Sequence, residues 1–303
     1  MALYDISGDS LIPIKKENFE KERHLQNLTE KNLNELFNLE FVASEFQVDN
    51  LRIDTLAYNP EIKSFVIIEY KKGKNYSVVD QGYTYLSLLL NNKAEFVLKY
   101  NQVFNTNHGK EYFDFSQTSV MFISPSYTKY QLKSVEFKDI SFELWKVTRF
   151  SNGTVLYDKI NNTESNASIK EIKSEDTKKT TVNREIKKYT EEDMLSGKSD
   201  NICELYESFK EKILDEFDDI EINPTKFYIA FKANNKIVIS LLVQSSSLKI
   251  WINLKKINDP ENKIRDVTNI GHHGIGNFEI KLKSEDDFYY FMGLFKQAYD
   301  DKF

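Results

Sequence analysis

The chain has 303 residues, of which 40% are hydrophobic and 14% aromatic, and it contains one cysteine. Single cores stop growing at about 250–300 residues, so this length predicts two domains. The lone cysteine excludes an internal disulfide. The net charge of -6 argues against sequence-independent binding of nucleic acid through a broad basic surface, although it leaves a local basic groove open.

The amino-terminal stretch MALYDISGDSLIPIKK has no basic segment followed by an apolar run and a small-residue cleavage site. No window of the chain approaches the roughly 18 uninterrupted apolar residues of a membrane span. We therefore expect a soluble, cytoplasmic protein with no membrane partner.

The first half of the chain reads as alternating helical and strand-like patterns. Residues 18–38 carry leucines and a phenylalanine at helical spacing, which predicts one long amphipathic helix. The runs LRIDTLAY and SFVIIEYK follow, joined by a loop that contains Asn59-Pro60, and they predict a β-hairpin. From Ser77 the apolar spacing is again helical, which predicts a helix over 77–91.

Further along, KAEFVLKY, SVMFISP, ISFELWKVTRF and GTVLYDKI add strands or mixed elements, so we expect an α/β domain over residues 1–160. Residues 161–189 are rich in Asn, Ser, Thr, Lys and Glu and contain only isolated aliphatics. Such a composition buries too little apolar area to offset the entropy of ordering, and it predicts a polar linker with room for a short helix.

Residues 190–303 predict a smaller α+β domain. An amphipathic helix with apolar positions from Ile202 to Phe217 precedes the strand candidates KFYIAFKA, KIVISLLVQ, LKIWINLKK and NFEIKLK. The dipeptide Asn234-Asn235 tolerates positive φ and suits a hairpin between the first two of these strands. A final helix over the last residues completes a domain with an antiparallel sheet.

The buried-looking run Phe65-Val66-Ile67-Ile68 ends abruptly in charge, at Glu69 and Lys71. Residues two apart share a face of a strand, so these two side chains point the same way and Tyr70 points away. If Ser64 lies opposite Asn59 in the hairpin, then Glu69 lies opposite Asp54. Facing Cβ atoms in an antiparallel pair are about 5 Å apart, so the two carboxylates would repel each other.

A divalent cation between the two carboxylates would resolve that repulsion, and Mg²⁺ prefers such oxygen ligands. Lys71 could then orient or help deprotonate a water at the metal, or stabilise charge that develops on a phosphate. This constellation predicts phosphodiester hydrolysis. The plainer alternative is that Asp54 and Glu69 pair with Arg52, Lys71 or Lys72 at a solvated sheet edge.

The neighbouring helices carry further candidates. Gln81 and Tyr85 are four residues apart and project from one helix face, although Tyr85 taken alone suits the core. On the first helix, Glu30 shares a side with apolar positions, where an acid is less common than on the wet face. A glutamate at the helix rim is the plainer alternative.

The order of a helix glutamate, an aspartate, an ExK motif and a QxxxY motif resembles the PD-(D/E)XK nuclease superfamily. The stretches HLQNLTEKNLNELFNLEFVASEF, LRIDTLAYN and FVIIEYKKG are similar to its RecB-like and archaeal NucS-like branch over residues 20–95. The resemblance implies a restriction-endonuclease-like fold, with a mixed sheet flanked by helices, and cleavage of nucleic acid, DNA foremost, with Mg²⁺ or Mn²⁺. Ile53 stands where the motif often has proline.

The resemblance also assigns roles to single residues. It implies Asp54, Glu69 and the Tyr70 backbone carbonyl as metal ligands and Lys71 as the catalytic lysine. Glu30 matches the family's helix glutamate. Gln81 and Tyr85 match the QxxxY pair, to which the family assigns positioning of the substrate or of the catalytic lysine. Because many members cut as dimers, a homodimer is also compatible with the resemblance.

The second half resembles a small bacterial domain of unknown function that is sometimes labelled a predicted transport protein. The resemblance rests on the stretches YIAFKANNKIVISLL, IWINLKK and DVTNIGHHGIGNFEIKL. His272 and His273, in the Gly-rich loop, could ligate a metal or touch a ligand, or serve as turn residues. We expect them to form a binding surface with Trp251, Lys255 and Lys256. A dinucleotide site is excluded, because GxxGxG here does not follow a strand and open a helix.

Two functions remain open at this stage. The first is a metal-dependent nuclease whose carboxy-terminal domain recognises a substrate or partner. The second is a non-catalytic module that binds nucleic acid or protein on a nuclease-like fold, which the acidic net charge favours.

Overall fold

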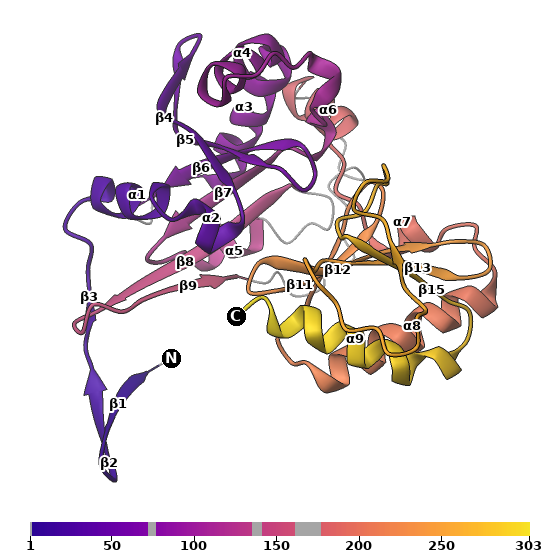
Figure 1. Cartoon of the computed structure of the whole chain (residues 1–303). Coiled ribbons are helices and arrows are strands. Elements are labelled where there is room, and N and C mark those ends of the chain that lie inside the picture. Colours follow the sequence, from indigo (N-terminus) through magenta and orange to yellow (C-terminus); the bar gives the residue numbers. More distant parts are fainter. Residues whose placement is uncertain (1, 72–76, 135–140, 161–176) are drawn as a thin grey trace. The chain divides into compact units, whose positions relative to one another are not determined.

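The computed structural model describes residues 2–71, 77–134, 141–160 and 177–303. The chain divides into two compact units, Met1–Lys188 and Tyr189–Phe303 (Figure 1).

The first unit contains a mixed sheet flanked by helices, as the sequence predicts. Strands β6, β7 and β8 run parallel, and the other pairings are antiparallel. The strands lie in the order β3 (Lys16–Glu17), β8 (Phe142–Phe150), β7 (Ser119–Ser124), β6 (Ser64–Tyr70), β5 (Leu51–Asn59) and β4 (Glu40–Val48), with β9 (Val155–Lys159) also on β8.

Helices cover both faces of this sheet. The helical segments of the unit are α1 (Glu22–Glu30), α2 (Leu33–Phe37), α3 (Val78–Asn91), α4 (Lys93–Phe104), α5 (Lys129–Ser134), α6 (Thr177–Glu185) and the 3₁₀ turns Lys110–Tyr112 and Phe115–Gln117. The apolar side chains of α1 and α2 belong to the core on one face of the sheet, and those of α3, α4 and α6 to the core on the other.

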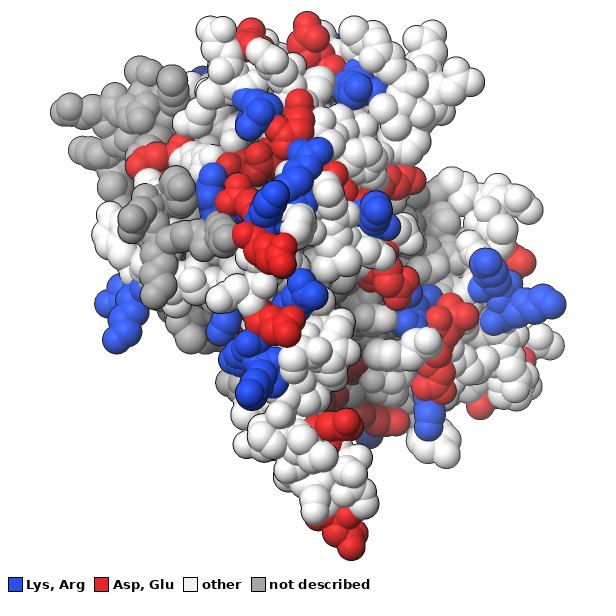
Figure 2. Space-filling view, turned by 90° about the vertical axis from the view of Figure 1, so that its left-hand side faces the viewer, with Lys and Arg blue, Asp and Glu red and all other residues white. Residues whose placement is uncertain are grey.

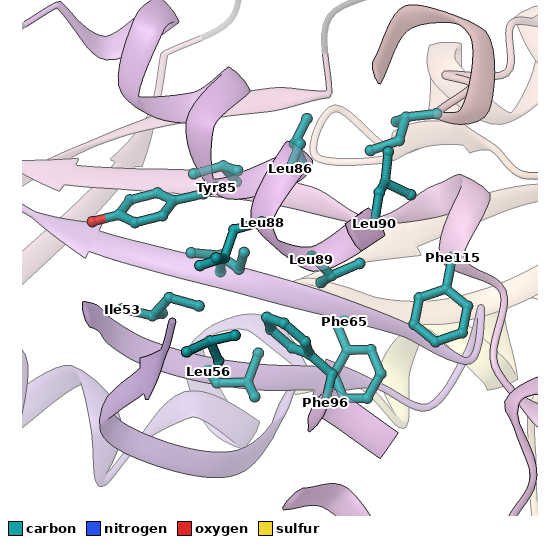
Figure 3. Close-up of a cluster of buried hydrophobic side chains, with 14 of the residues drawn as sticks. Ile53, Leu56, Phe65, Tyr85, Leu86, Leu88, Leu89, Leu90, Phe96 and Phe115 are labelled. Carbon is teal, nitrogen blue, oxygen red and sulfur yellow. The ribbon is translucent and has the colours of Figure 1, made fainter. Parts of the chain in front are cut away.

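The central strand β6 supplies side chains to both cores because successive residues of a strand point to opposite faces. Phe65 and Ile67 pack on the α3 side, and Val66, Ile68 and Tyr70 on the α1 side. Figure 3 shows the α3-side core, with Tyr85 at its edge and the tyrosine hydroxyl directed away from the leucines. The next residue of β6 on this side is Glu69, so a charged group follows directly on the apolar cluster.

The predicted hairpin is present with the predicted register. β5 and β6 pair antiparallel, with Asn59 opposite Ser64 and Thr55 opposite Ile68. The helix predicted over 77–91 is α3, and the Ser77 hydroxyl at its start accepts a hydrogen bond from the Asp80 N–H.

Two helical predictions need correction. The helix expected over 18–38 is broken, because Asn32 leaves the helical conformation with φ -126° and ψ 20° and separates α1 from α2. KAEFVLKY, expected to be a strand or mixed element, forms α4. Its Phe96, Val97 and Tyr100 have the spacing of a single helix face and are buried in the core.

The predicted linker 161–189 is only partly tested. Residues 161–176 lie outside the described residues. Residues 177–188, however, belong to the first unit, and Val182 and Ile186 of this stretch are buried in its core. The linker prediction is wrong for them, because two aliphatic residues four apart make an apolar stripe that an average composition does not reveal.

A hairpin that the sequence reading missed precedes the sheet. β1 (Leu3–Ser7) and β2 (Ser10–Ile14) pair antiparallel around Gly8, whose φ of +58° suits the first central position of a two-residue turn. The hairpin extends away from the seven-stranded sheet (Figure 1). Its turn signal, Ser-Gly-Asp-Ser between two apolar runs, was legible in the sequence.

The second unit has an antiparallel sheet with helices, as predicted. Its strands lie in the order β10 (Glu221–Pro224), β11 (Ile229–Ala233), β12 (Lys236–Val243), β13 (Leu248–Ile252), β15 (Phe278–Leu282) and β14 (Arg265–Asp266). Its helical segments are α7 (Glu191–Leu195), α8 (Asp200–Glu216), the 3₁₀ turn Glu285–Asp287 and α9 (Phe288–Asp300). α8 and α9 share one core with the sheet, and Asn234 and Asn235 both have positive φ in the hairpin turn.

In the described ranges, no helix combines the length and the apolarity that crossing a bilayer requires.

Candidate active site

Glu69 stands at the centre of a hydrogen-bond cluster at the end of β6. The residue is 3% exposed. Oε1 accepts hydrogen bonds from Lys71 Nζ at 2.5 Å and Gln81 Nε2 at 2.7 Å, and Oε2 accepts one from the Tyr85 hydroxyl at 2.7 Å. Three residues predicted from the sequence therefore converge on one buried carboxylate.

The helix α3 explains why Gln81 and Tyr85 act together. Residues four apart on a helix are neighbours on its surface, and Gln81 Nε2 also donates to the Tyr85 hydroxyl oxygen at 3.2 Å. Burial, followed by the negative charge of Glu69, raises the pKa of Tyr85, so its hydroxyl stays protonated and donates to Glu69. The plainer alternative is that Tyr85 serves only the core. It explains why the ring is buried but not why the hydroxyl bonds to Glu69.

Asp54 lies on β5 beside Glu69. Asp54 Oδ2 accepts a hydrogen bond from the Tyr70 backbone N–H at 3.1 Å, and the strand register that pairs Thr55 with Ile68 sets Asp54 across from Glu69. Burial and then the negative charge of Glu69 raise the pKa of Asp54 to about 7, although the Tyr70 N–H and the Lys71 ammonium act in the opposite direction. Asp54 is therefore partly protonated near neutral pH in the metal-free chain.

The structure agrees only in part with the plainer alternative, in which the two carboxylates form simple ion pairs at a solvated sheet edge. Lys71 does pair with Glu69, but the two side chains are only 14% and 5% exposed. Arg52 pairs with Glu45 and not with Asp54. Lys72 lies outside the described residues.

Glu30 lies on the other face of the sheet and reaches the cluster indirectly. Its Oε1 accepts hydrogen bonds from Thr55 Oγ1 at 2.6 Å and from Gln26 Nε2 at 3.0 Å. The Thr55 hydroxyl lies 3.3 Å from the Tyr70 hydroxyl, whose ring packs on the α1 side. Among the described residues, the polar contacts of the Glu30 carboxylate thus go to side chains that surround Asp54 and Tyr70 and not to Glu69 or Lys71.

Gln26 is a residue of the site that sequence reasoning missed. It is 4% exposed, and its Nε2 lies within 3.3 Å of acceptors on Glu30, Ser44, Glu45 and the backbone carbonyl of Asp54. One amide therefore ties α1 to β4 and to the strand position that carries Asp54. Its place four residues before Glu30 was the available signal.

We expect Gln26→Ala to lower the free energy of unfolding by about 1–3 kcal/mol, because the variant removes a buried amide and its hydrogen bonds to α1, β4 and β5. Urea denaturation of the full chain measures the effect. Asn27→Ala, at the exposed next position of the same helix, is the matched control and should change stability by less than about 0.5 kcal/mol. Equal effects of the two substitutions would contradict the role of Gln26.

A cluster of ions borders Gln26. Glu45 accepts Arg23 Nη1 at 2.6 Å and Arg52 Nε at 2.8 Å, and the two arginine side chains are 51% and 68% exposed. Glu45 has a φ of +53° in the middle of β4, a conformation that costs a non-glycine residue on the order of 1 kcal/mol and that tends to mark functional sites. On the face of the first unit that carries α1, basic and acidic side chains are interspersed (Figure 2).

The donor set fits a hard divalent cation at Asp54 and Glu69. A carboxylate offers about four lone-pair sites. On Glu69, three of these lone-pair sites accept hydrogen bonds from described residues, and on Asp54 one does. Both carboxylates therefore have lone pairs left to coordinate a cation. Within the described ranges no group of three or more His, Cys, Asp or Glu side chains is placed to hold a metal ion. A cation would therefore need further ligands from the backbone or from water. The Tyr70 carbonyl remains the candidate for a backbone ligand.

In the second unit, the Gly-rich loop folds back over the sheet. His272 places Nδ1 2.9 Å from the Ile270 carbonyl oxygen and Nε2 2.8 Å from that of Gly276, and His273 stacks on Phe227 with ring centroids 4.7 Å apart. Both carbonyls are acceptors, so a neutral imidazole donates to only one of them at a time. Lys255 and Lys256 are exposed.

Trp251 does not belong to an exposed binding surface, contrary to the prediction. It is 2% exposed, because the loop covers the ring and Gly274 packs directly on it. A Cβ at Gly274 would lie 2.1 Å from a ring atom of Trp251. The absence of a side chain at Gly274 is what lets the loop close over the tryptophan.

Comparison with known proteins gives one full-length relative. An uncharacterized protein of Haemophilus influenzae is 42% identical over 303 residues, which is 99% of this chain and 100% of that protein. Residues 191–302 match a family model described as a domain of unknown function, DUF5655. This range coincides with the second unit.

Solved structures are similar to about half of the chain. A repair endonuclease from Pyrococcus abyssi matches 44% of this chain and 49% of its own, with 16% identity and a TM-score of 0.25. An EndoMS complex with double-stranded DNA matches 48% of this chain and 64% of its own, with 12% identity. SfsA of Pyrococcus furiosus in complex with Ca²⁺ matches 52% of this chain and 74% of its own, with 15% identity. Both have TM-scores of 0.25.

Proposed function

The chain belongs to the same family as the Haemophilus influenzae protein, and we propose that it is a metal-dependent nuclease that hydrolyses phosphodiester bonds in nucleic acid, with DNA as the expected substrate. The observation that carries the proposal is the convergence of Lys71, Gln81 and Tyr85 on the buried carboxylate of Glu69, with Asp54 beside it. This arrangement agrees with the ExK and QxxxY motifs of the sequence.

Asp54 and Glu69 would hold Mg²⁺ or Mn²⁺, with the Tyr70 carbonyl as a further ligand. The cation would supply positive charge that polarises the scissile phosphate and offsets its charge. The raised pKa of Asp54 supports this assignment, because burial and the charge of Glu69 both disfavour the ionised form, and a bound cation would offset both.

The protein's own groups have separable roles in this proposal. Gln81 and Tyr85 hold the Glu69 carboxylate in one orientation, so that its geometry is set before substrate arrives. Lys71, whose Nζ now donates to Glu69, would offer its ammonium to the phosphate. The exposed guanidinium groups of Arg23 and Arg52 would contact neighbouring phosphates, for which their planar donor geometry is suited.

A non-catalytic binding module is the second candidate, and one observation favours it. The three hydrogen bonds already satisfy much of the Glu69 carboxylate without any metal. In this alternative the cluster is a buried polar network that fixes the fold, and nucleic acid or protein binds without being cut.

The test is a cleavage panel of labelled single-stranded, double-stranded and forked DNA and of RNA, with Mg²⁺ or Mn²⁺ and, in parallel, with EDTA. We expect cleavage of at least one DNA substrate that EDTA abolishes. Binding to the same panel is followed by fluorescence anisotropy. Binding without cleavage under every condition would favour the second candidate, and metal-independent cleavage would contradict the proposed site.

A further inference from the structure

Two arginines hold the carboxylate of Glu45 beside the candidate active site. Arg23 Nη1 lies 2.6 Å from Glu45 Oε1, and Arg52 Nε lies 2.8 Å from Oε2, so each carboxylate oxygen has its own guanidinium. The three side chains carry one net positive charge. Each guanidinium has five N–H donors, of which the described residues engage only some. The two guanidinium groups therefore form an arginine clamp with donors left for a further anion.

The arginine clamp lies next to the proposed metal ligands. Gln26 Nε2 is 3.2 Å from Glu45 Oε1 and 2.9 Å from the Asp54 backbone carbonyl oxygen. Arg52 precedes Asp54 by two residues on β5, which puts the two residues on one face of the strand, about 7 Å apart. One strand of nucleic acid carries a phosphate per about 3.4 Å of helix axis. A strand whose scissile phosphate lies at Asp54 would therefore bring another phosphate to the clamp.

The carboxylate of Glu45 presents the same kind of anion to the clamp as a phosphodiester does. Each group shares one negative charge between two terminal oxygens, and each binds arginine through paired N–H···O hydrogen bonds. Glu45 holds its carboxylate there with a backbone φ of +53°, which is unfavourable for any residue except glycine. The contacts of its side chain with the clamp offset that cost. Glu45 thus occupies the clamp as an internal anion that matches a phosphodiester of a nucleic-acid strand.

We propose that the clamp of Arg23 and Arg52 binds an intact phosphodiester next to the scissile one, and that Glu45 fills this site until the substrate displaces it. The inference rests on the proposed function, since it takes nucleic acid as the substrate. The Glu45 side chain is 30% exposed, so on displacement its carboxylate turns to water. A strand binds the clamp only when its own contacts replace those of Glu45. Glu45 therefore disfavours weak binding of nucleic acid.

Binding of labelled DNA of about 12 nucleotides, as a single strand and as a duplex, tests the proposal by fluorescence anisotropy with the full chain in EDTA. Glu45→Gln removes the charge and keeps the size of the side chain, and we expect it to bind about three- to tenfold more tightly than the parent. Glu45→Gly, which adopts positive φ without strain, should show the same gain. Asp49→Asn removes one negative charge at the turn of the same hairpin and should change affinity by less than about twofold.

The gain must also depend on the two arginines. Adding Glu45→Gln to a chain that carries Arg23→Gln and Arg52→Gln should change affinity by less than about twofold, and thermal melting checks that each variant is folded. A gain that persists in this chain would overturn the proposal.

So would Glu45 variants that bind neither probe, or that bind no more tightly than Asp49→Asn. None of these measurements requires cleavage. A chain that cuts no substrate with Mg²⁺ or Mn²⁺ but shows the arginine-dependent gain would contradict the nuclease and support the clamp.

Discussion

Lys71→Ala is expected to reduce nucleic-acid cleavage by a factor of about 10²–10⁴, the range over which a single positioned acid–base or charge-stabilising group acts. The Lys71 side chain is 14% exposed and lies 2.5 Å from Glu69, so it is fixed beside the proposed metal ligands. Its removal takes away the ammonium but leaves Gln81 and Tyr85 bonded to Glu69. The loss should therefore fall on the reaction and less on the fold.

Lys110→Ala is the matched control for charge. Lys110 is exposed in the 3₁₀ turn near the opposite end of β6, where the Asp114 N–H bonds the Lys63 carbonyl. The control should cleave like the parent. If Lys71→Ala cleaves at the parental rate while both proteins remain folded, the activity does not come from this site.

Asp54→Asn is expected to stabilise the metal-free protein above neutral pH. The carboxyl has an ordinary pKa of 3.8, and burial and the charge of Glu69 raise it to about 7 in the folded chain. Between these values the folded state holds more protons than the unfolded state, so the Asp54 contribution to stability falls as pH rises through this window. Asparagine resembles the protonated acid and does not titrate.

The difference in unfolding free energy between the Asp54→Asn variant and the parent should therefore be near zero below about pH 4, grow up to about pH 7 and remain constant above it. We expect about 1–2 kcal/mol at pH 8 in EDTA, after allowance for solvent screening of this partly exposed group. Urea denaturation across this pH range measures the difference. Asp49→Asn, the same substitution at the exposed turn of the preceding hairpin, is the matched control.

The same variant also tests the metal. A ligand that binds only the folded state raises its stability by mass action, by about 1.4 kcal/mol at ten times the dissociation constant. Millimolar Mg²⁺ or Mn²⁺ should raise the melting temperature of the parent and of Asp49→Asn, but not that of Asp54→Asn. If saturating metal leaves the melting temperature of the parent unchanged, the result would count against the metal site.

Much of the candidate site was predictable because its parts lie close together in the chain. Glu69 and Lys71 share a strand face, and a short loop fixes the register that sets Asp54 across from Glu69. Gln81 and Tyr85 follow on the next helix at a spacing that puts both on one side. Local periodicity and one hairpin suffice to bring these five residues together.

Contacts between distant segments were not predictable in the same way. Gln26 joins α1 to β4 and β5, and nothing in its immediate neighbours shows that its amide meets the Asp54 carbonyl. Glu45 receives Arg23 and Arg52 from two different elements. The burial of Trp251 likewise depends on a loop more than twenty residues away closing over it.

Apolar periodicity and turn chemistry over short windows predict the two compact units, the mixed and antiparallel sheets and the charged end of β6. Tertiary packing settles where α1 breaks, that residues 177–188 join the first unit, and how Gln26 and Glu30 approach Asp54. Those outcomes depend on which apolar surfaces of the sheet remain exposed after it has formed, because the helical segments compete to pack on them. This competition depends on the whole fold and not on any one segment.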